Sequence, residues 1–475
     1  MVGHDRLFWR AARGSAALML ALAAGGALAQ AQAGRAPENI LPPAPQPGAT
    51  PAPAQSPSAT PAPAAAASPV IQPLPVVPPA PPVDLEPVMT FTLAQAQELL
   101  GLIERIDADG LIPADYQPDA LRAAIAAGPG AALDEQASRS LAWLIEDLRD
   151  GRTRMAARVQ WFAVDPDVDV NPTAAVMARA LASGNIAGTL DGLRPTHPDY
   201  ARLKAELAKT PAADRATRRL IQVNLDRWRW LPRDLGKYYL LTNVPEFQLR
   251  LTVDNEIIRS YRTIVGKPGR TATPQLAETV TDVVFNPTWT VPQSIVKGEG
   301  LGAQLLANPA RAKRENYKVT KAKDGTIHVV QQPGPNNALG RMKLDMPNPH
   351  AIFIHDTPGR HLFNAANRAL SHGCIRTDRA MELAITMAIL GAGKSPDEAV
   401  AILNSGKYTK VPMTRTFPVY ITYFTMASDI GGKLGRFNDL YGRDAPVLAA
   451  FAAPRKPWDG QRQSTEKVIK LDNPL

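Results

Sequence analysis

The hydrophobic pattern of this chain changes its period once, near Tyr238. Before that point, apolar residues recur every three or four positions, which is typical of helices that pack by one face. After it come short apolar runs separated by turn residues such as Asp254-Asn255, which is typical of strands. The sequence therefore predicts a multidomain α+β protein, in which a mostly helical N-terminal domain precedes a β-rich domain.

Two segments precede the helical pattern. Three arginines stand before an apolar run at 16–24, and Ala-Leu-Ala follows at 27–29, so we expect 1–29 to be a signal peptide. The run is short for a bilayer crossing, although a retained anchor is the alternative. Residues 30–88 are rich in Pro, Ala and Ser and cannot bury enough apolar surface to offset the entropy of ordering. We expect a disordered linker, either a functional spacer or a tolerated tail, in a protein exported to the periplasm or cell envelope.

The helical domain is predicted over 89–210. Thr92 and Gln95 have the spacing of a capping box and should open its first helix. A second helix is expected over 134–150, and a third should begin after Asn171-Pro172 and end at Gly184.

A linking segment at 211–237 should contain one further helix. Its end reads Arg-Trp-Arg-Trp at 227–230. Such alternation can stack on sugars or bases, but it also suits a helix packed between two domains, and packing is the interpretation we favour.

The β-rich domain is predicted over 238–425. Residues 426–453 are expected to form a C-terminal hairpin with the end of this domain. In that hairpin 420–423 would pair with 436–443, and Gly431-Gly432 would lie in the turn. The remaining tail, 454–475, is polar and is expected to be loose.

The net charge of the 475-residue chain is +9. A basic chain often binds nucleic acid. Here, however, lysine and arginine are scattered rather than gathered in a stripe. We therefore expect no nucleic-acid partner, and an anionic cell wall or membrane surface suits an exported protein better.

Residues 350–376 hold four of the seven histidines (His350, His355, His361 and His372) and the single cysteine, Cys374. A lone cysteine forms no internal disulfide, and beside clustered histidines it is a candidate nucleophile. The alternative is an inert buried thiol.

The same stretch resembles a known family. His355, fifteen intervening residues and then Ser-His-Gly-Cys-Ile-Arg at 371–376 are similar to the signature of the L,D-transpeptidases, which have a YkuD-type catalytic domain. The longer match, from Pro-Asn-Pro-His at 347–350 to Arg376, resembles the YcbB-like branch. His-Pro-Asp-Tyr at 197–200 is similar to the scaffold domain of that branch. A small peptidoglycan-binding module found in many members has no counterpart here.

The resemblance implies a β-sandwich-like, YkuD-type fold for the β-rich domain and roles for the motif residues. Cys374 would be the nucleophile and His355 its base, oriented by the backbone carbonyl of Asp356. The backbone N–H groups of His372, Gly373 and Cys374 would form the oxyanion hole.

Further roles around the motif are expected. Arg376 is placed to meet a substrate carboxylate, and Ser371 is expected to support the turn. Thr377 should cap a helix over 378–390, whose positive end would favour the Cys374 thiolate. The insertion at 290–338 stands where YcbB-like enzymes carry a lid, although any surface insertion would have the same composition.

Two other sites are weaker alternatives. A zinc site of His355, His361, His372 and Cys374 has no familiar ligand spacing. Gly-Ala-Gly-Lys-Ser at 391–395 resembles a phosphate loop but lacks its first glycine, and Ser395 with Glu398 is better explained as a capping box. His350 and His361 are expected to be structural.

As a cysteine acyltransferase of this family, the protein would use no cofactor. The resemblance implies a tetrapeptide donor stem, a diaminopimelate acceptor, 3→3 cross-links in peptidoglycan and inhibition by carbapenem-type β-lactams. Water, a D-amino acid or the lysine of a wall or outer-membrane protein are alternative acceptors. A non-catalytic wall-binding scaffold is the alternative from another class.

Overall fold

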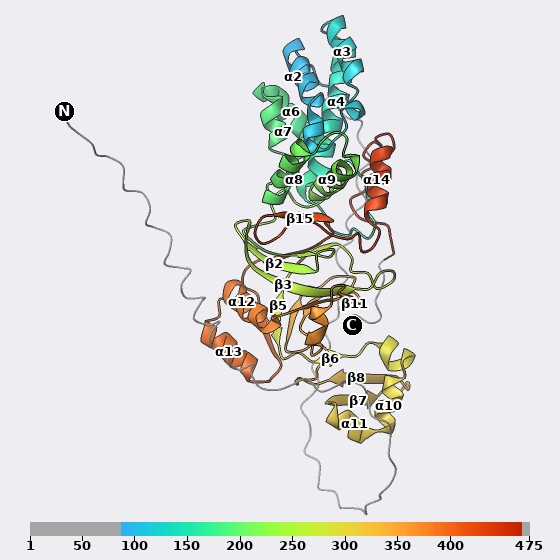
Figure 1. Cartoon of the computed structure of the whole chain (residues 1–475), viewed down its shortest axis with the longest axis vertical. Coiled ribbons are helices and arrows are strands. Elements are labelled where there is room, and N and C mark those ends of the chain that lie inside the picture. The colour runs from blue at the N-terminus through green and yellow to red at the C-terminus, as the bar shows by residue number, and fades with distance from the viewer. Residues whose placement is uncertain (1–86, 468–475) are drawn as a thin grey trace, which may run out of the picture. The chain divides into compact units, whose positions relative to one another are not determined.

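The structure, a computed structural model, describes residues 87–467 (Figure 1). The predicted signal peptide and all but the end of the predicted linker lie outside the described residues. Within 87–467, no helix combines the length and apolar character that crossing a bilayer requires.

Helices fill the first part of the described chain, as predicted. Their bounds are α2 (Leu93–Ile103), α3 (Pro118–Ala127), α4 (Ala131–Asp150), α5 (Asp167–Val170), α6 (Thr173–Ser183), α7 (Ile186–Asp191) and α8 (Pro198–Lys209). Short 3-10 helices lie between them: η1 (Ile106–Asp109), η2 (Pro113–Tyr116) and η3 (Met155–Ala157).

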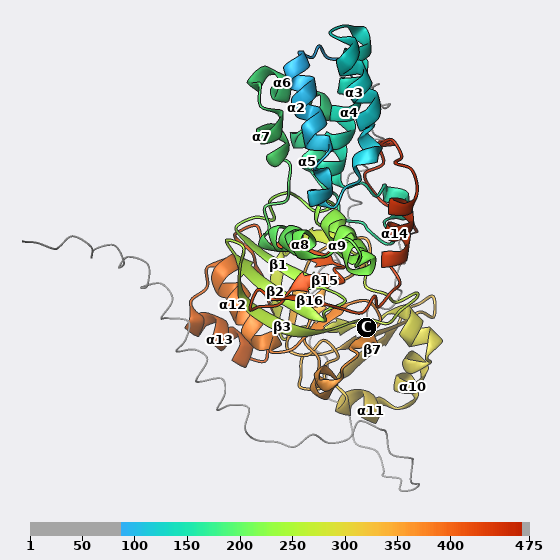
Figure 2. The same ribbon diagram turned by 45° about the horizontal axis from the view of Figure 1, so that its top comes forward.

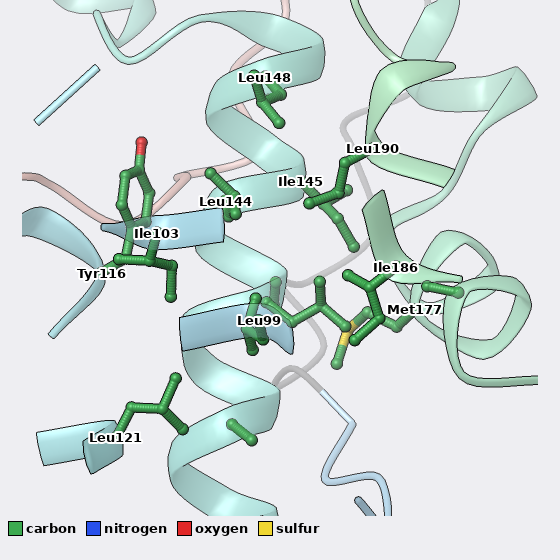
Figure 3. Close-up of a cluster of buried hydrophobic side chains, with 14 of the residues drawn as sticks. Leu99, Ile103, Tyr116, Leu121, Leu144, Ile145, Leu148, Met177, Ile186 and Leu190 are labelled. Atoms are coloured by element: carbon green, nitrogen blue, oxygen red, sulfur yellow. The ribbon is translucent and has the colours of Figure 1, made fainter. Parts of the chain in front are cut away.

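A single apolar core holds these helices together. Figures 1 and 2 show α2, α3, α4, α6 and α7 side by side, and Figure 3 shows the side chains between them. Leu99 and Ile103 of α2 meet Leu144 and Ile145 of α4, and Met177 of α6 closes the cluster. All five are fully buried, and each contributes roughly 1.5–3 kcal/mol of transfer free energy.

The predicted helix ends are largely confirmed. The Thr92 side chain accepts from the Gln95 N–H and Gln95 returns the bond, which completes the capping box. Helix α4 begins three residues earlier than predicted and ends at Gly151, and α6 ends at Gly184 in a left-handed conformation.

The linking helix α9 (Arg215–Trp228) packs between the helical and β-rich parts, so the packing interpretation is confirmed. Trp228 and Trp230 are buried. Arg227 Nη1 lies 2.5 Å from the Asp444 carboxylate, and Arg229 donates to the Tyr200 hydroxyl over 2.8 Å. All four side chains are buried in this interface, so none of them offers an exposed surface on which a sugar or base could stack.

The β-rich part is built on one continuous, curled sheet, which confirms the predicted fold class. Its strands are β1 (Tyr238–Asn243), β2 (Gln248–Val253), β3 (Glu256–Gly266), β4 (Leu276–Thr279), β5 (Asp282–Phe285), β9 (Met342–Asp345), β10 (Ile354–His355), β11 (Ala369–Ser371), β12 (Ile375–Thr377), β13 (Thr409–Pro412) and β14 (Pro418–Thr422). Their order is β13-β5-β9-β10-β12-β3-β2-β1-β14-β4, and β11 also pairs with β3.

The predicted insertion folds as a small unit with its own core. Its elements are β6 (Trp289–Thr290), the π-helix η4 (Ser294–Gly298), α10 (Leu301–Ala307), α11 (Pro309–Arg314), β7 (Tyr317–Lys321) and β8 (Ile327–Gln331). The three strands pair in the order β6-β8-β7, and Val296, Leu305 and Val329 are buried between sheet and helices. Figure 1 shows these elements gathered together.

Within the motif stretch, η5 (Arg360–Asn364) precedes β11, and beyond it α12 (Ala380–Ala392) and α13 (Pro396–Asn404) follow β12. The Ser395–Glu398 capping box is confirmed at the start of α13, with Pro396 in its first turn. The predicted Thr377 cap is wrong. Thr377 ends strand β12, and α12 begins only after Arg379, whose backbone is left-handed.

The C-terminal region differs from the prediction. The hairpin pairs β15 (Met426–Ser428) with β16 (Leu434–Arg436), whereas residues 420–422 belong to β14 of the large sheet. Residues 437–443, predicted as part of the second hairpin strand, form a loop that leads into helix α14 (Asp444–Ala452). The described part of the tail is not loose. Arg455 is buried between Glu146 and Asp147 of α4, with nitrogen–oxygen distances of 2.6 and 2.8 Å.

Candidate active site

Two short parallel strands bring the motif residues together. Strand β10 pairs with β12 in a register that sets His355 opposite Arg376. The Ile375 N–H donates to the Phe353 carbonyl, so the pairing continues to Cys374 opposite Phe353. Because alternate residues of a strand share one face, Phe353, His355, Cys374 and Arg376 project to the same side.

The His355 ring is held in one tautomer. Its Nδ1 lies 2.6 Å from the backbone oxygen of Asp356, and since a carbonyl only accepts, Nδ1 carries the proton. The other nitrogen, Nε2, is buried and has no hydrogen-bond partner in the described part of the chain. Burial, with the nearby Arg376 charge, lowers the pKa of His355 to about 3. The ring is therefore neutral, and its Nε2 lone pair is free to accept a proton.

Cys374 is a neutral thiol in this structure. It is fully buried, and its sulfur lies 3.6 Å from the carbonyl of Ala351. Burial raises the pKa of Cys374 to about 12, although a backbone hydrogen bond from Phe353 acts in the opposite direction. The predicted support from a helix end is absent because β12 separates Cys374 from α12. Thiolate formation thus requires proton transfer to a neighbouring base.

Ser371 closes the turn that presents the thiol. Its hydroxyl donates to the Cys374 carbonyl over 2.7 Å and accepts from the Gly373 N–H over 3.1 Å. Gly373 has φ +123°, a conformation that side chains strongly disfavour. Of the three predicted oxyanion donors, the Gly373 amide is therefore already engaged. Within 87–467, no hydrogen bond gives the Cys374 or His372 amide an internal acceptor.

Arg376 is half-buried on the same face, and its Nε is buried without a partner in the described chain. Burial lowers the pKa of Arg376, which nevertheless stays a cation near neutral pH. An unsatisfied guanidinium beside the thiol is suited to bind a carboxylate.

Sequence reasoning missed two residues of this site, Lys343 and Phe353. Lys343 on β9 pairs directly with His355, and its ammonium lies 4.3 Å from the centre of the Phe353 ring. The Phe353 and His355 ring centres are 5.4 Å apart. Alternation in Met342-Lys343-Leu344 could have placed Lys343 on a strand, but only the sheet order brings that strand to His355.

The other three histidines of residues 350–376 differ from His355 in burial and in neighbours. His350 is buried against Phe162, with ring centres 4.2 Å apart, and burial lowers the pKa of His350 to about 4. His361 is exposed on η5. His372 is half-buried, and among its charged neighbours is Glu299, just after η4 of the insertion. Among the described residues, no group of three or more His, Cys, Asp and Glu side chains could hold a metal ion.

The insertion reaches the site through Phe353, which packs against the insertion's core. The Phe353 ring also lies beside the His355 ring, and the Phe353 backbone forms the hydrogen bond to the Cys374 sulfur. The insertion therefore borders the motif at Phe353, and its role as a lid stays a prediction.

Two family models match parts of this chain. Residues 237–413 match the family model of the L,D-transpeptidase catalytic domain (YkuD), and residues 89–207 match that of the Scaffold domain. A putative L,D-transpeptidase from Haemophilus influenzae is 30% identical over 245 residues, which are 48% of this chain and 49% of that protein. The chain thus spans about half the length of this curated relative.

Solved structures with weaker similarity include an L,D-transpeptidase from Mycobacterium smegmatis, with 15% identity and a TM-score of 0.20, covering 39% of this chain and 58% of that one. L,D-transpeptidase 3 from Mycobacterium tuberculosis has 12% identity and a TM-score of 0.21, covering 39% of this chain and 60% of that one. Likenesses at this level add no argument to the two domain matches. On those matches, the chain carries a YkuD-type L,D-transpeptidase catalytic domain preceded by a Scaffold domain.

Proposed function

We propose that this protein forms 3→3 cross-links in peptidoglycan through a thioester on Cys374. One observation carries the proposal. His355, fixed in the tautomer that leaves Nε2 open, shares a sheet face with the buried thiol of Cys374 inside an L,D-transpeptidase domain. This is the arrangement that a thiol–imidazole acyl transfer requires.

In the first half-reaction, His355 Nε2 takes the proton of the Cys374 thiol, and the sulfur adds to the carbonyl carbon of the third stem residue, a meso-diaminopimelate, in a tetrapeptide donor. The carbonyl electrons move to oxygen, where the open Cys374 and His372 amides would stabilise the charge. The intermediate then collapses, and the terminal D-Ala amine leaves with the proton from His355. A thioester remains on Cys374.

In the second half-reaction, the side-chain amine of a neighbouring diaminopimelate attacks the thioester. His355 accepts the amine's proton and returns it to the departing sulfur, which restores the thiol. Every proton and electron pair is supplied by the substrates and the two side chains, so the cycle needs no cofactor.

Arg376 supports substrate binding in this scheme. Its partnerless guanidinium beside the thiol would pair with a carboxylate of the donor stem. The insertion would act as the lid, because Cys374 and His355 are both fully buried and a stem peptide must displace something to reach them.

We propose carbapenem-type β-lactams as inhibitors, since their strained carbonyl offers the same thioester chemistry. The M. tuberculosis L,D-transpeptidase 3 structure contains a faropenem-derived adduct. We also propose export to the periplasm or cell envelope, where peptidoglycan is accessible, on the pattern of the first thirty residues.

The experiment that tests this function is incubation of the purified chain with disaccharide-tetrapeptides, followed by mass spectrometry of the products. A dimer formed with loss of D-Ala, and fragmenting as a 3→3 link, is the expected result. Released tripeptide would identify water as the acceptor, and an exchanged terminal residue would identify a D-amino acid. Unchanged substrate at all protein concentrations would favour the non-catalytic scaffold.

A further inference from the structure

The structure assigns Thr273 as a positioning residue that orients the Cys374 amide. The inference rests on the proposed acyl transfer. Thr273 lies a hundred residues before the catalytic turn and outside the family signature, and its side chain is fully buried. The Thr273 hydroxyl donates to the Gly373 carbonyl over 2.8 Å and accepts from the Gly266 N–H over 2.9 Å.

The Gly373 carbonyl and the Cys374 N–H belong to the same peptide unit. A trans peptide is planar, so its C=O and N–H point in opposite directions. A hydrogen bond that fixes the Gly373 oxygen therefore also fixes the direction of the Cys374 N–H. That amide has no internal acceptor in the described chain, as an oxyanion donor requires.

This peptide needs an anchor because of the glycine before it. Gly373 has φ +123°, and glycine passes between such conformations at little cost. Ser371 holds the peptide units on either side, through the Gly373 N–H and the Cys374 carbonyl. The unit between them is held by Thr273.

Thr273 is itself rigidly placed. The Tyr441 hydroxyl accepts from the Thr273 N–H over 3.3 Å and donates to the Gly266 carbonyl over 2.6 Å. A side chain at Gly266 would collide with the Thr271 carbonyl, at 1.8 Å from an added Cβ, so this approach requires glycine. The segment between β16 and α14 thus supports the turn that carries the nucleophile.

The test compares two reactions of the same thiol. Acylation by a carbapenem puts negative charge on a carbonyl oxygen and needs the oriented amide. Alkylation by iodoacetamide forms a carbon–sulfur bond with loss of iodide and creates no oxyanion. Loss of one oxyanion donor typically costs about 10²–10³-fold in rate. We expect Thr273→Val to slow the maximal acylation rate at least about tenfold, with the half-saturating carbapenem concentration nearly unchanged, and to leave alkylation within about twofold of wild type.

Thr273→Ser keeps the hydroxyl and should recover most of the acylation rate. Tyr441→Phe, which removes the second support, should give a smaller loss in acylation and again spare alkylation. Thr242→Val is the matched control, because Thr242 is also a fully buried threonine, but its hydroxyl has no partner in the described chain. If Thr273→Val fails to fold, as judged by its melting transition, the Thr273→Ser and Tyr441→Phe pair decides the question.

Normal acylation by Thr273→Val, or by Tyr441→Phe where Thr273→Val does not fold, would overturn the inference and leave the proposed function intact. Equal losses in acylation and alkylation would also overturn it, since they indicate a general distortion of the turn. Failure of the proposed function is a separate result: wild-type protein would then show no acylation at all, or Cys374→Ala would retain it.

Discussion

The imidazole of His355 is fixed by the backbone of its own neighbour, with Nδ1 at 2.6 Å from the carbonyl oxygen of Asp356. No side-chain carboxylate is needed to choose the tautomer. The Asp356 carboxylate instead accepts from the Arg341 N–H over 2.9 Å, which holds the residue in place from the other side. The ring is therefore oriented by main-chain geometry, and the nitrogen left free to accept a proton is Nε2.

Replacing the two motif histidines should have unequal effects. His355→Ala removes the imidazole that we propose as the base for Cys374 and should slow acylation by at least about 10²-fold. His372→Ala should lose less, because alanine keeps the backbone N–H that we propose as its contribution. Acylation rates by intact-protein mass spectrometry give the comparison. An inactive His372→Ala beside a nearly normal His355→Ala would reverse the assignment.

The thiol should be protonated near neutral pH. Burial raises the pKa of Cys374 to about 12 and lowers the pKa of His355 to about 3, so the resting pair is thiol and neutral imidazole and not an ion pair. Far-ultraviolet thiolate absorbance, taken as wild type minus Cys374→Ala, should be absent near neutral pH, and alkylation should accelerate as pH rises. A full thiolate signal at neutral pH would show that the pair is ionised at rest.

Mild acid should destabilise the fold through buried histidines. His197 stacks on Trp228, and burial lowers the pKa of His197 from 6.5 to about 4. The unfolded chain binds a proton near pH 6.5 and the folded chain does not, so this contribution to the free energy of unfolding falls as pH drops from 6.5 to about 4.

Asparagine is the matched replacement at that position, because it is neutral and can also cap α8. Denaturant unfolding at several pH values should give His197→Asn a shallower pH dependence than wild type in this window. His350 and His355 would still contribute in both proteins. Identical slopes for the two proteins would contradict the predicted role of His197.

Chelators should leave activity intact, whereas a carbapenem should acylate the protein and abolish turnover. The described residues contain no cluster suited to a metal ion, and the proposed cycle closes without one. Cross-linking assays with EDTA, and with EDTA followed by zinc, provide the measurement. Activity that disappears with EDTA and returns with zinc would move the chemistry to the histidine cluster.

Local chemistry made part of this structure predictable from the sequence. The capping boxes at Thr92 and Ser395 form as expected, because they need only residues three positions apart. The period change near Tyr238 placed the first strand correctly, because hydrophobic period is also a local pattern. The period change also indicated the α+β fold class, and the family signature supplied the motif, since its residues lie within one short stretch.

Long-range packing explains what the sequence did not predict. Helix α12 begins after Arg379, whose guanidinium lies over the Tyr261 ring at 4.8 Å, a contact across more than a hundred residues. The thiol pKa rises because the whole sheet buries Cys374, an effect that outweighs any local signal. The contacts of Thr273 and Tyr441 with the catalytic turn were not predicted, because only the folded chain brings these residues to it.

The most direct test of the central claim is the mass of the intact protein during reaction with a tetrapeptide donor. The account predicts a transient adduct equal to the donor minus D-Ala, located on Cys374 by peptide mapping and absent from a Cys374→Ala variant that retains the wild-type melting temperature. Cross-linked product formed at a substantial rate by that folded variant, or an adduct on any other residue, would contradict the account.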